Sequence, residues 1–341
     1  MKFPRPKKVL FCNNKGGVGK TTLSFQVAVN LAKKGYKVAL IDLDPQCNLT
    51  LQTLGYTFYE DNLFTPARAK TVYDLLKPKI EGSGDIDLSV PLHHVRDNIY
   101  ILPGDIQLSV FESILMTSAG EAAAGLLRGY SDTSAIDRYL SKVGAAEGID
   151  IFIIDTSPSL GVLNRFIFLG AEYFVVPLTP DSYSLQGIGN LGKVFEGWKK
   201  NWQITAKAAA VAGDTPNSHV LQGDALFIGY IVNEFNRYDH KVIKRQQEWV
   251  DKINNQVKES LSEKHGRNGL VEKSWKNPLG NTQDYGQLTS ISMKNNLGFE
   301  EFDIEAMAEI KAGGGTAQLH EKAVEEIGKL TDNIINILQK Y

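Results

Sequence analysis

The chain has 341 residues, and its 37 Lys and Arg residues nearly balance its 39 Asp and Glu residues, giving a formal net charge of −2. Such a chain is not a polycation, so any contact with nucleic acid has to come from a local basic patch. Its two cysteines are too few for a disulfide framework or a four-thiolate cluster. It has no apolar run of transmembrane length and no apolar signal core near its N-terminus, so we expect a cytoplasmic protein.

Strand and helix patterns alternate along the chain, which predicts an α/β fold. The expected architecture is one doubly wound, mainly parallel sheet flanked by helices, in a single domain over residues 1–341 with surface insertions near 205–225 and 265–285. Buried strands are expected at 8–12, 37–42, 98–102, 151–155, 173–177 and 227–233, with a weaker one at 288–293. Helices are expected at 22–34, 106–116, 121–143, 160–169, 182–198, 240–261 and 316–339.

The first predicted strand leads into a glycine-rich segment that reads Asn-Asn-Lys-Gly-Gly-Val-Gly-Lys-Thr-Thr. It departs once from the phosphate-loop pattern Gly-x-x-x-x-Gly-Lys-Ser/Thr, because Asn14 replaces the first glycine. Glycines let backbone N–H groups approach phosphate oxygens, and the following helix N-terminus favours an anion. Lys20 is expected to reach the β- and γ-phosphates, and Thr21 to offer its hydroxyl to Mg²⁺. The predicted nucleotide-binding residues are Gly16, Gly17, Val18, Gly19, Lys20, Thr21 and Thr22.

Three aspartates lie where predicted strands end, at the sheet edge that would carry the phosphate loop. Asp155 is expected to hold the Mg²⁺ shell, together with Thr21. Asp42 and Asp44 leave the second strand at the same edge, so either carboxylate could bind the metal or orient an attacking water. We assign Asp42 to the metal. Each aspartate could instead cap a turn or a helix without touching the nucleotide.

The absence of one sequence motif indicates which base the bound nucleotide carries. The chain has no Asn-Lys-x-Asp sequence of the kind that reads guanine, which favours ATP over GTP. Asn233, at the end of the sixth predicted strand, is expected to contact the adenine edge, and an ordinary strand-end asparagine is the alternative. The expected cofactors are therefore ATP and Mg²⁺.

Several segments resemble the ParA/MinD family of deviant phosphate-loop ATPases, and Soj-type partition proteins in particular. The loop from Lys15 to Thr22 is similar to the family's signature-lysine loop. Residues 42–50 are similar to its second motif, with Cys47 where glycine is usual, and residues 153–161 to its third. Residues 98–112 and 174–187 also resemble family segments, so the likeness covers about residues 7–240.

The resemblance implies particular roles for these residues. Lys15 would cross a dimer interface to the phosphates of the partner's ATP, while Lys20 and Thr21 would serve the chain's own nucleotide. Asp44 would position the hydrolytic water. Two subunits would enclose two ATP molecules, and slow hydrolysis, stimulated by a ParB-like partner protein, would release the dimer.

Branches of this family differ in what the dimer binds. The chain has too few cysteines for an iron–sulfur cluster and no tyrosine cluster like that of bacterial tyrosine kinases. Its C-terminal helix is slightly acidic, which disfavours binding to an anionic membrane. Residues 237–276 carry ten Lys or Arg against six Asp or Glu, so this segment could bind DNA non-specifically and associate with the nucleoid. The candidate DNA-binding residues are Lys241, Lys244, Arg245 and Lys252.

Three functions follow from these observations. The first is a ParA-type ATPase that drives plasmid or chromosome partition. The second is a related ATPase that positions or regulates another cargo, in which case the basic segment is an ordinary solvated helix. The third is a metabolic enzyme on the same loop, such as a ligase related to dethiobiotin synthetase, and the ParA-like segment at 42–48 argues against it.

Overall fold

The computed structural model describes the chain except for residues 1, 64–68, 214, 234–239, 268–277 and 313–316. The described residues contain an eight-stranded sheet in the order β3-β4-β2-β5-β1-β6-β7-β8. Its neighbouring strands are parallel except for the β3–β4 pair. This confirms the predicted α/β class with a mainly parallel sheet. The strands are β1 (Lys7–Phe11), β2 (Val38–Leu43), β3 (His93–Arg96), β4 (Ile99–Leu102), β5 (Ile151–Thr156), β6 (Tyr173–Leu178), β7 (Leu226–Val232) and β8 (Gly280–Asn281).

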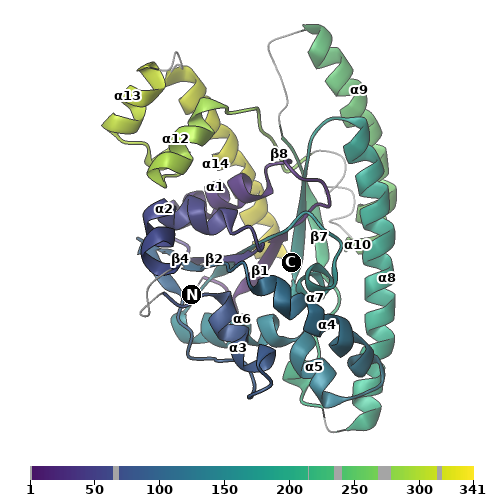
Figure 1. The fold of residues 1–341 in the computed structure, drawn as a ribbon. Coiled ribbons are helices and arrows are strands. Elements are labelled where there is room, and N and C mark those ends of the chain that lie inside the picture. Colours follow the sequence, from purple (N-terminus) through teal and green to yellow (C-terminus); the bar gives the residue numbers. More distant parts are fainter. Residues whose placement is uncertain (1, 64–68, 214, 234–239, 268–277, 313–316) are drawn as a thin grey trace.

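Helices cover both faces of the sheet, as Figure 1 shows, which explains why the central strands are mainly apolar. One face carries α3 (Val72–Ile80), α4 (Leu108–Ala123), α5 (Leu127–Thr133), α6 (Ala135–Glu147), α7 (Val162–Gly170), α8 (Ser182–Ala212) and α9 (His240–Val257). The other carries α1 (Lys20–Lys33), the start of α2 (Asn48–Leu63), α12 (Gln287–Asn295), α13 (Ile304–Ala312) and α14 (Ala317–Lys340). No helix of the described residues is long and apolar enough to cross a membrane.

Two predicted elements are wrong. The strand expected at 288–293 lies within helix α12, where Leu288 and Ile291 are buried at helical spacing on the α1 side of the sheet. The single helix expected at 121–143 is three helices, because α4 ends before Gly125, which has a φ of 83°, and Ser134 separates α5 from α6. A left-handed glycine ends a helix at little steric cost.

Other elements went unpredicted or run further than expected. Helix α8 continues to Ala212 and so takes in part of the first predicted insertion. Helices α2, α3 and α13 and strands β3 and β8 were not predicted. The second insertion contains β8 and the end of α10 (Glu263–His265), and its residues 268–277 lie outside the described part of the chain.

Candidate functional site

The phosphate loop connects β1 to α1 at the carboxyl end of the sheet. Gly17 and Gly19 have φ angles of 73° and 81°, which side chains rarely adopt. A Cβ atom on Gly19 would lie 2.4 Å from Nδ2 of Asn233, so a larger residue would force the Asn233 side chain to move. Gly19 also precedes α1 without a side-chain cap, which leaves the first N–H groups of the helix for an anion. These features fit the predicted phosphate loop.

Lys20 places its ammonium inside the loop. The residue is 7% exposed, and Nζ lies 3.4 Å from the backbone oxygen of Lys15. Burial lowers the pKa of Lys20, while the negative charges of Asp155 and Asp44 oppose that shift. The cation therefore lies among the carboxylates expected to serve the nucleotide.

Thr21 and Asp155 meet directly, as the magnesium prediction requires. The Thr21 hydroxyl donates to Oδ2 of Asp155 at 2.6 Å. The other oxygen, Oδ1, is buried and has no hydrogen-bond partner among the described residues. Burial, and next the charge of Asp42, raise the pKa of Asp155 to about 7. A buried carboxylate oxygen without a hydrogen-bond donor is suited to contact a Mg²⁺ ion or one of its water ligands. Mg²⁺ in proteins typically uses only one or two protein carboxylates and keeps several waters.

Asp42 is placed differently. Strand pairing sets it beside Asp155, but it is fully buried, and burial raises its pKa to about 6. Its Oδ2 accepts hydrogen bonds from the backbone N–H and the hydroxyl of Thr50 at 2.8 and 2.6 Å, and Oδ1 accepts one from Asp44 N–H at 3.2 Å. Because both oxygens already have protein donors, Asp42 is less suited to bind metal than Asp155 and better suited to shape the turn that carries Asp44.

Asp44 lies in a tight turn after β2. Its Oδ1 accepts the N–H of Gln46 at 2.9 Å, and its backbone oxygen accepts the N–H of Cys47 at 2.8 Å. Cys47 has a φ of 56°, in the left-handed region that glycine adopts most easily. This explains why glycine is usual at this position in the family that the segment resembles. Asp44 is 6% exposed, and its negative charge opposes the lowering of the Lys20 pKa.

Lys15 contacts the segment between β6 and α8 of its own chain. Its ammonium donates to Oδ2 of Asp181 at 2.5 Å and to Oγ1 of Thr179 at 2.6 Å. Asp181 is also the N-cap of α8, because its Oδ1 accepts the N–H of Ser184 at 2.8 Å. The side chains of Lys15 and Asp181 remain 31% and 37% exposed. Sequence reasoning missed this ion pair, since Thr-Pro-Asp before a helix signals a cap but not a distant partner.

A cavity of about 370 Å³ opens beside the loop, next to Gly17, Gly19 and Thr22. Asn233 lies in its wall, as expected of a residue near the base, but its amide is already engaged: Nδ2 donates to Val18 O at 3.2 Å and Oδ1 accepts from the Thr282 hydroxyl at 2.8 Å. A further part of the wall comes from residues between 283 and 327, which were not predicted to contribute. Its residues are Gln283, Asp284, Tyr285, Gly286, Thr289, Ser290 and Ile327.

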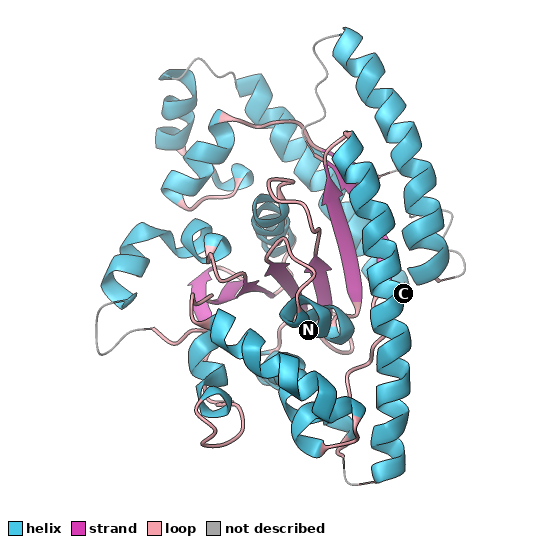
Figure 2. Cartoon of the chain, turned by 45° about the vertical axis from the view of Figure 1, so that its right-hand side comes forward, coloured by secondary structure: helices cyan, strands magenta, loops and turns pink. Residues whose placement is uncertain are grey.

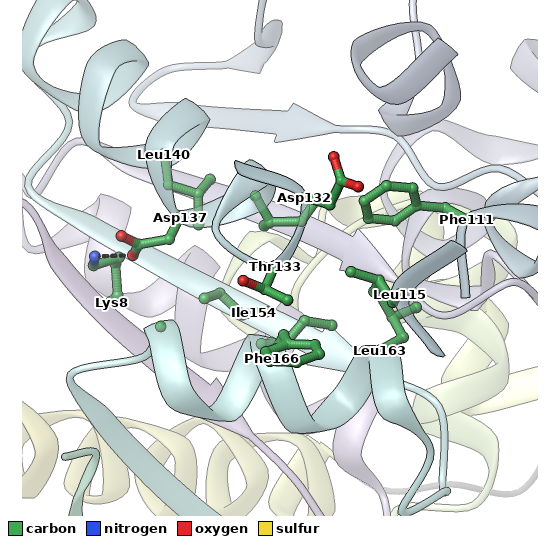
Figure 3. A pocket seen from close by; sticks show the side chains of 13 residues that line it. Lys8, Phe111, Leu115, Asp132, Thr133, Asp137, Leu140, Ile154, Leu163 and Phe166 are labelled. Atoms are coloured by element: carbon green, nitrogen blue, oxygen red, sulfur yellow. Dashed lines mark hydrogen bonds and ion pairs between the residues drawn. The ribbon is translucent and has the colours of Figure 1, made fainter. Parts of the chain in front are cut away.

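A second cavity lies on the face of the sheet opposite α1. Figure 3 shows apolar side chains such as Phe111, Leu115 and Phe166 filling it, with the Lys8–Asp137 ion pair at one side. Only about 20 Å³ of open space remains there. This is room for little more than a water molecule, so the cavity is a packing gap in the core.

The predicted DNA-binding residues are only partly described. Helix α9 is present, but the side chains of Lys241, Lys244 and Arg245 lie outside the described residues. Lys252 is exposed, and its ammonium lies 4.7 Å from the centre of the Trp249 ring.

Comparisons with known proteins agree with this geometry. Residues 6–207 match the model of a family described as an AAA domain. A virulence-plasmid ParA family protein of Chlamydia psittaci is 33% identical over 208 residues, which are 56% of this chain and 70% of that protein. The chromosome-partitioning ATPase Soj of Treponema pallidum is 32% identical over 184 residues, which are 53% of this chain and 60% of that protein. The match with Soj thus spans less than two thirds of that relative's length.

A solved structure is similar over most of the chain. The crystal structure of a Corynebacterium diphtheriae protein has a TM-score of 0.66 and 25% identity, and the likeness covers 85% of this chain and 97% of that one. Together with the phosphate loop, these matches define a phosphate-loop ATPase. The chain belongs to the AAA domain family matched above and, within it, is of the ParA/MinD type.

Proposed function

We propose that the chain hydrolyses ATP slowly in a homodimer that encloses two nucleotides, binds DNA non-specifically in that state and drives partition with a ParB-like partner protein. The observation that carries this proposal is the meeting of Lys20, Thr21, Asp155 and Asp44 at one edge of the sheet, with Lys15 at the entrance of the same loop. The naming of relatives as ParA family and Soj proteins supports the partition role.

Each side chain has a proposed task in hydrolysis. Lys20 and the loop N–H groups hold the phosphates, and Thr21 with Asp155 holds Mg²⁺, which would supply charge neutralisation on the phosphate oxygens. Asp44 orients the attacking water with the carboxylate oxygen that Gln46 does not use. Asp42 positions Asp44 by accepting a hydrogen bond from the backbone N–H of Asp44.

We place the nucleobase in the cavity beside the loop. Gln283 is 5% exposed, and its Nε2 has no hydrogen-bond partner among the described residues, while Lys322 donates to its Oε1 at 3.0 Å. That free amide donor suits a ring nitrogen or another acceptor on the base. Asn233 stabilises the loop, because its side-chain amide donates a hydrogen bond to the backbone oxygen of Val18.

Lys15 has to change partners for the dimer to form. In the isolated chain its ammonium pairs with Asp181, so contact with a second subunit's phosphates means leaving that carboxylate. A triphosphate carries more negative charge than one carboxylate and so can compete for the lysine. ATP binding and dimer formation are thereby linked through one side chain.

The test measures assembly and DNA binding in parallel. Light scattering gives the oligomeric state, and fluorescence anisotropy with a random-sequence duplex gives binding, each with ATP, ADP and no nucleotide at two salt concentrations. We expect a dimer only with ATP, and DNA binding only in that state, weaker at high salt. Dimer formation without DNA binding at either salt would leave the ATPase that positions another cargo. Absence of an ATP-dependent dimer would refute both.

A further inference from the structure

Helix α8 presents a regular row of lysines to solvent. Lys193, Lys200 and Lys207 are all exposed and follow one another at intervals of seven residues. Seven residues are almost two full turns, so the three side chains leave the helix on one side. From the first to the last, the row is about 21 Å long at 1.5 Å per residue. Figures 1 and 2 show α8 on the outside of the molecule, along most of its height.

Helix α8 itself is poor in acidic residues. Between Ser182 and Ala212 the only acidic residue is Glu196. Lys200 of the row and Lys264 of α10 both bind its carboxylate at 2.6 Å, and their hydrogen bonds lower the pKa of Glu196 to about 2. Two ammonium groups thus contact this one carboxylate. Polar amides extend the same face, at the exposed residues Gln186, Asn190 and Gln203.

The opposite side of α8 is fixed in the core. Leu191, Phe195 and Trp202 are each no more than 2% exposed, and Trp202 donates its ring N–H to Leu221 O at 2.9 Å. Apart from the exposed Tyr183, Ile204 and Val211, the large apolar side chains of α8 are buried or partly buried, whereas an amphipathic helix needs a continuous apolar side to bind a membrane. Its outward face carries lysines and amides, with Ile204 and Val211 exposed among them.

We propose that this lysine face of α8, formed by Lys193, Lys200, Lys207 and Lys264, binds the phosphate backbone of double-stranded nucleic acid. A row of about 21 Å matches about six base pairs of duplex at 3.4 Å each. Lysines contact phosphates as point charges, and neutral amides add hydrogen bonds to phosphate and sugar without reading sequence. The inference rests on the proposed function, because it names the surface on which that DNA would lie.

The test compares two variants that lose the same charge. The first changes Lys193, Lys200 and Lys207 to Gln, which keeps helix propensity and side-chain length. The matched control changes Lys77, Lys294 and Lys329 to Gln, three exposed lysines outside α8. Binding of a labelled 30-base-pair duplex of random sequence is measured with ATP between 50 and 200 mM salt. Thermal midpoints establish that each variant is folded.

We expect the α8 variant to bind the duplex at least about tenfold more weakly, with a log–log salt slope smaller by about 2 to 3, while the control stays within about twofold of the unaltered chain. The reciprocal change Glu196→Gln should strengthen binding about twofold to threefold. Equal losses in the two triple variants would overturn the assignment, and so would DNA binding that survives the α8 changes.

Two outcomes separate this inference from the proposed function. If the unaltered chain binds DNA and the α8 variant binds equally well, only the surface is wrong. If the unaltered chain dimerises with ATP but binds no duplex, the DNA arm of the proposed function fails and the α8 assignment fails with it. Binding to phosphatidylglycerol vesicles that depends on the α8 lysines, without binding to duplex, would instead identify a membrane as the partner.

Discussion

The phosphate loop and the outer face of α8 both carry lysines, but the environments of those lysines are opposite. Lys20 is 7% exposed and lies among Asp155 and Asp44, whereas the Lys200 side chain is 68% exposed. Charges interact strongly in the poorly screened interior and weakly in water, where salt screens them further. A single change at the loop should therefore abolish binding, while the α8 lysines should act only as a sum. Variants at the two kinds of site test that contrast, and the largest effect is expected at the loop.

Lys20→Ala should lower ATP affinity by about a hundredfold or more. The change removes charge-assisted hydrogen bonds to phosphate, worth about 1.5–3 kcal/mol each, and leaves the buried Asp155 carboxylate without its cation. Isothermal titration calorimetry with ATP and Mg²⁺ measures the loss. Lys329→Ala, an exposed lysine on α14, is the control and should bind ATP normally. Undiminished affinity in the Lys20 variant would contradict the loop assignment.

Asp44→Ala should lower ATP turnover by about a hundredfold while ATP binding and dimer formation persist, because a water-orienting carboxylate acts only in the chemical step. Phosphate release under saturating ATP measures turnover. Asp332→Ala removes an exposed carboxylate elsewhere and should leave turnover unchanged. If the two variants hydrolyse ATP equally fast, Asp44 has no part in the mechanism.

His265 tests a buried titratable group outside the loop, packed under α8. It is 3% exposed against Phe174 and Phe195, and burial lowers its pKa from 6.5 to about 4. The unfolded chain binds this proton more tightly, so stability that is complete above pH 6.5 is lost as the pH falls toward 4. The loss should reach about 2 kcal/mol at pH 5.

Urea unfolding of the unaltered chain and of His265→Phe between pH 4 and 7 measures this effect. The variant should be less sensitive to acid by about that amount, because a phenyl ring cannot take up a proton. His94→Phe, at an exposed position, should keep the sensitivity of the unaltered chain. Identical pH profiles for all three proteins would show that protonation of His265 does not limit stability.

Lys15→Ala should keep the ATP affinity of the monomer but raise the ATP concentration needed for half-maximal dimerisation at least about tenfold. The reason is that its ammonium is proposed to serve the partner's phosphates and not the chain's own. Light scattering during an ATP titration measures the dimer, and calorimetry on the monomer is the internal control. A variant that dimerises normally would refute the role across the interface.

Asp181→Asn should have the smallest effect and the opposite sign. It removes the charge that holds Lys15 but keeps an amide oxygen, and asparagine is as good an N-cap for α8 as aspartate. Because exposed ion pairs contribute about 0.2–1 kcal/mol, dimerisation should need up to about fivefold less ATP. A higher ATP requirement would mean that Asp181 positions Lys15 productively instead of retaining it.

The sequence predicted the central strands and the phosphate loop because their signals are local. Apolar runs such as Ile151–Ile154 mark buried strands, and glycines before Lys20 mark the loop, whatever the rest of the chain does. Helix ends were less certain: Gly125 divides a helix that periodicity alone joined, and α12 was mistaken for a strand because a short apolar run fits both periods.

The sequence alone determined that the chain has a phosphate loop with an additional lysine at its entrance, since both features are contiguous residues with fixed backbone demands. Tertiary structure decided which partners those residues have. Thr50 binds Oδ2 of Asp42, Asp181 pairs with Lys15 across 166 positions, and Gln283 lines the cavity from a segment distant in sequence. Such contacts depend on how strands are ordered in the sheet, and no local pattern records that order.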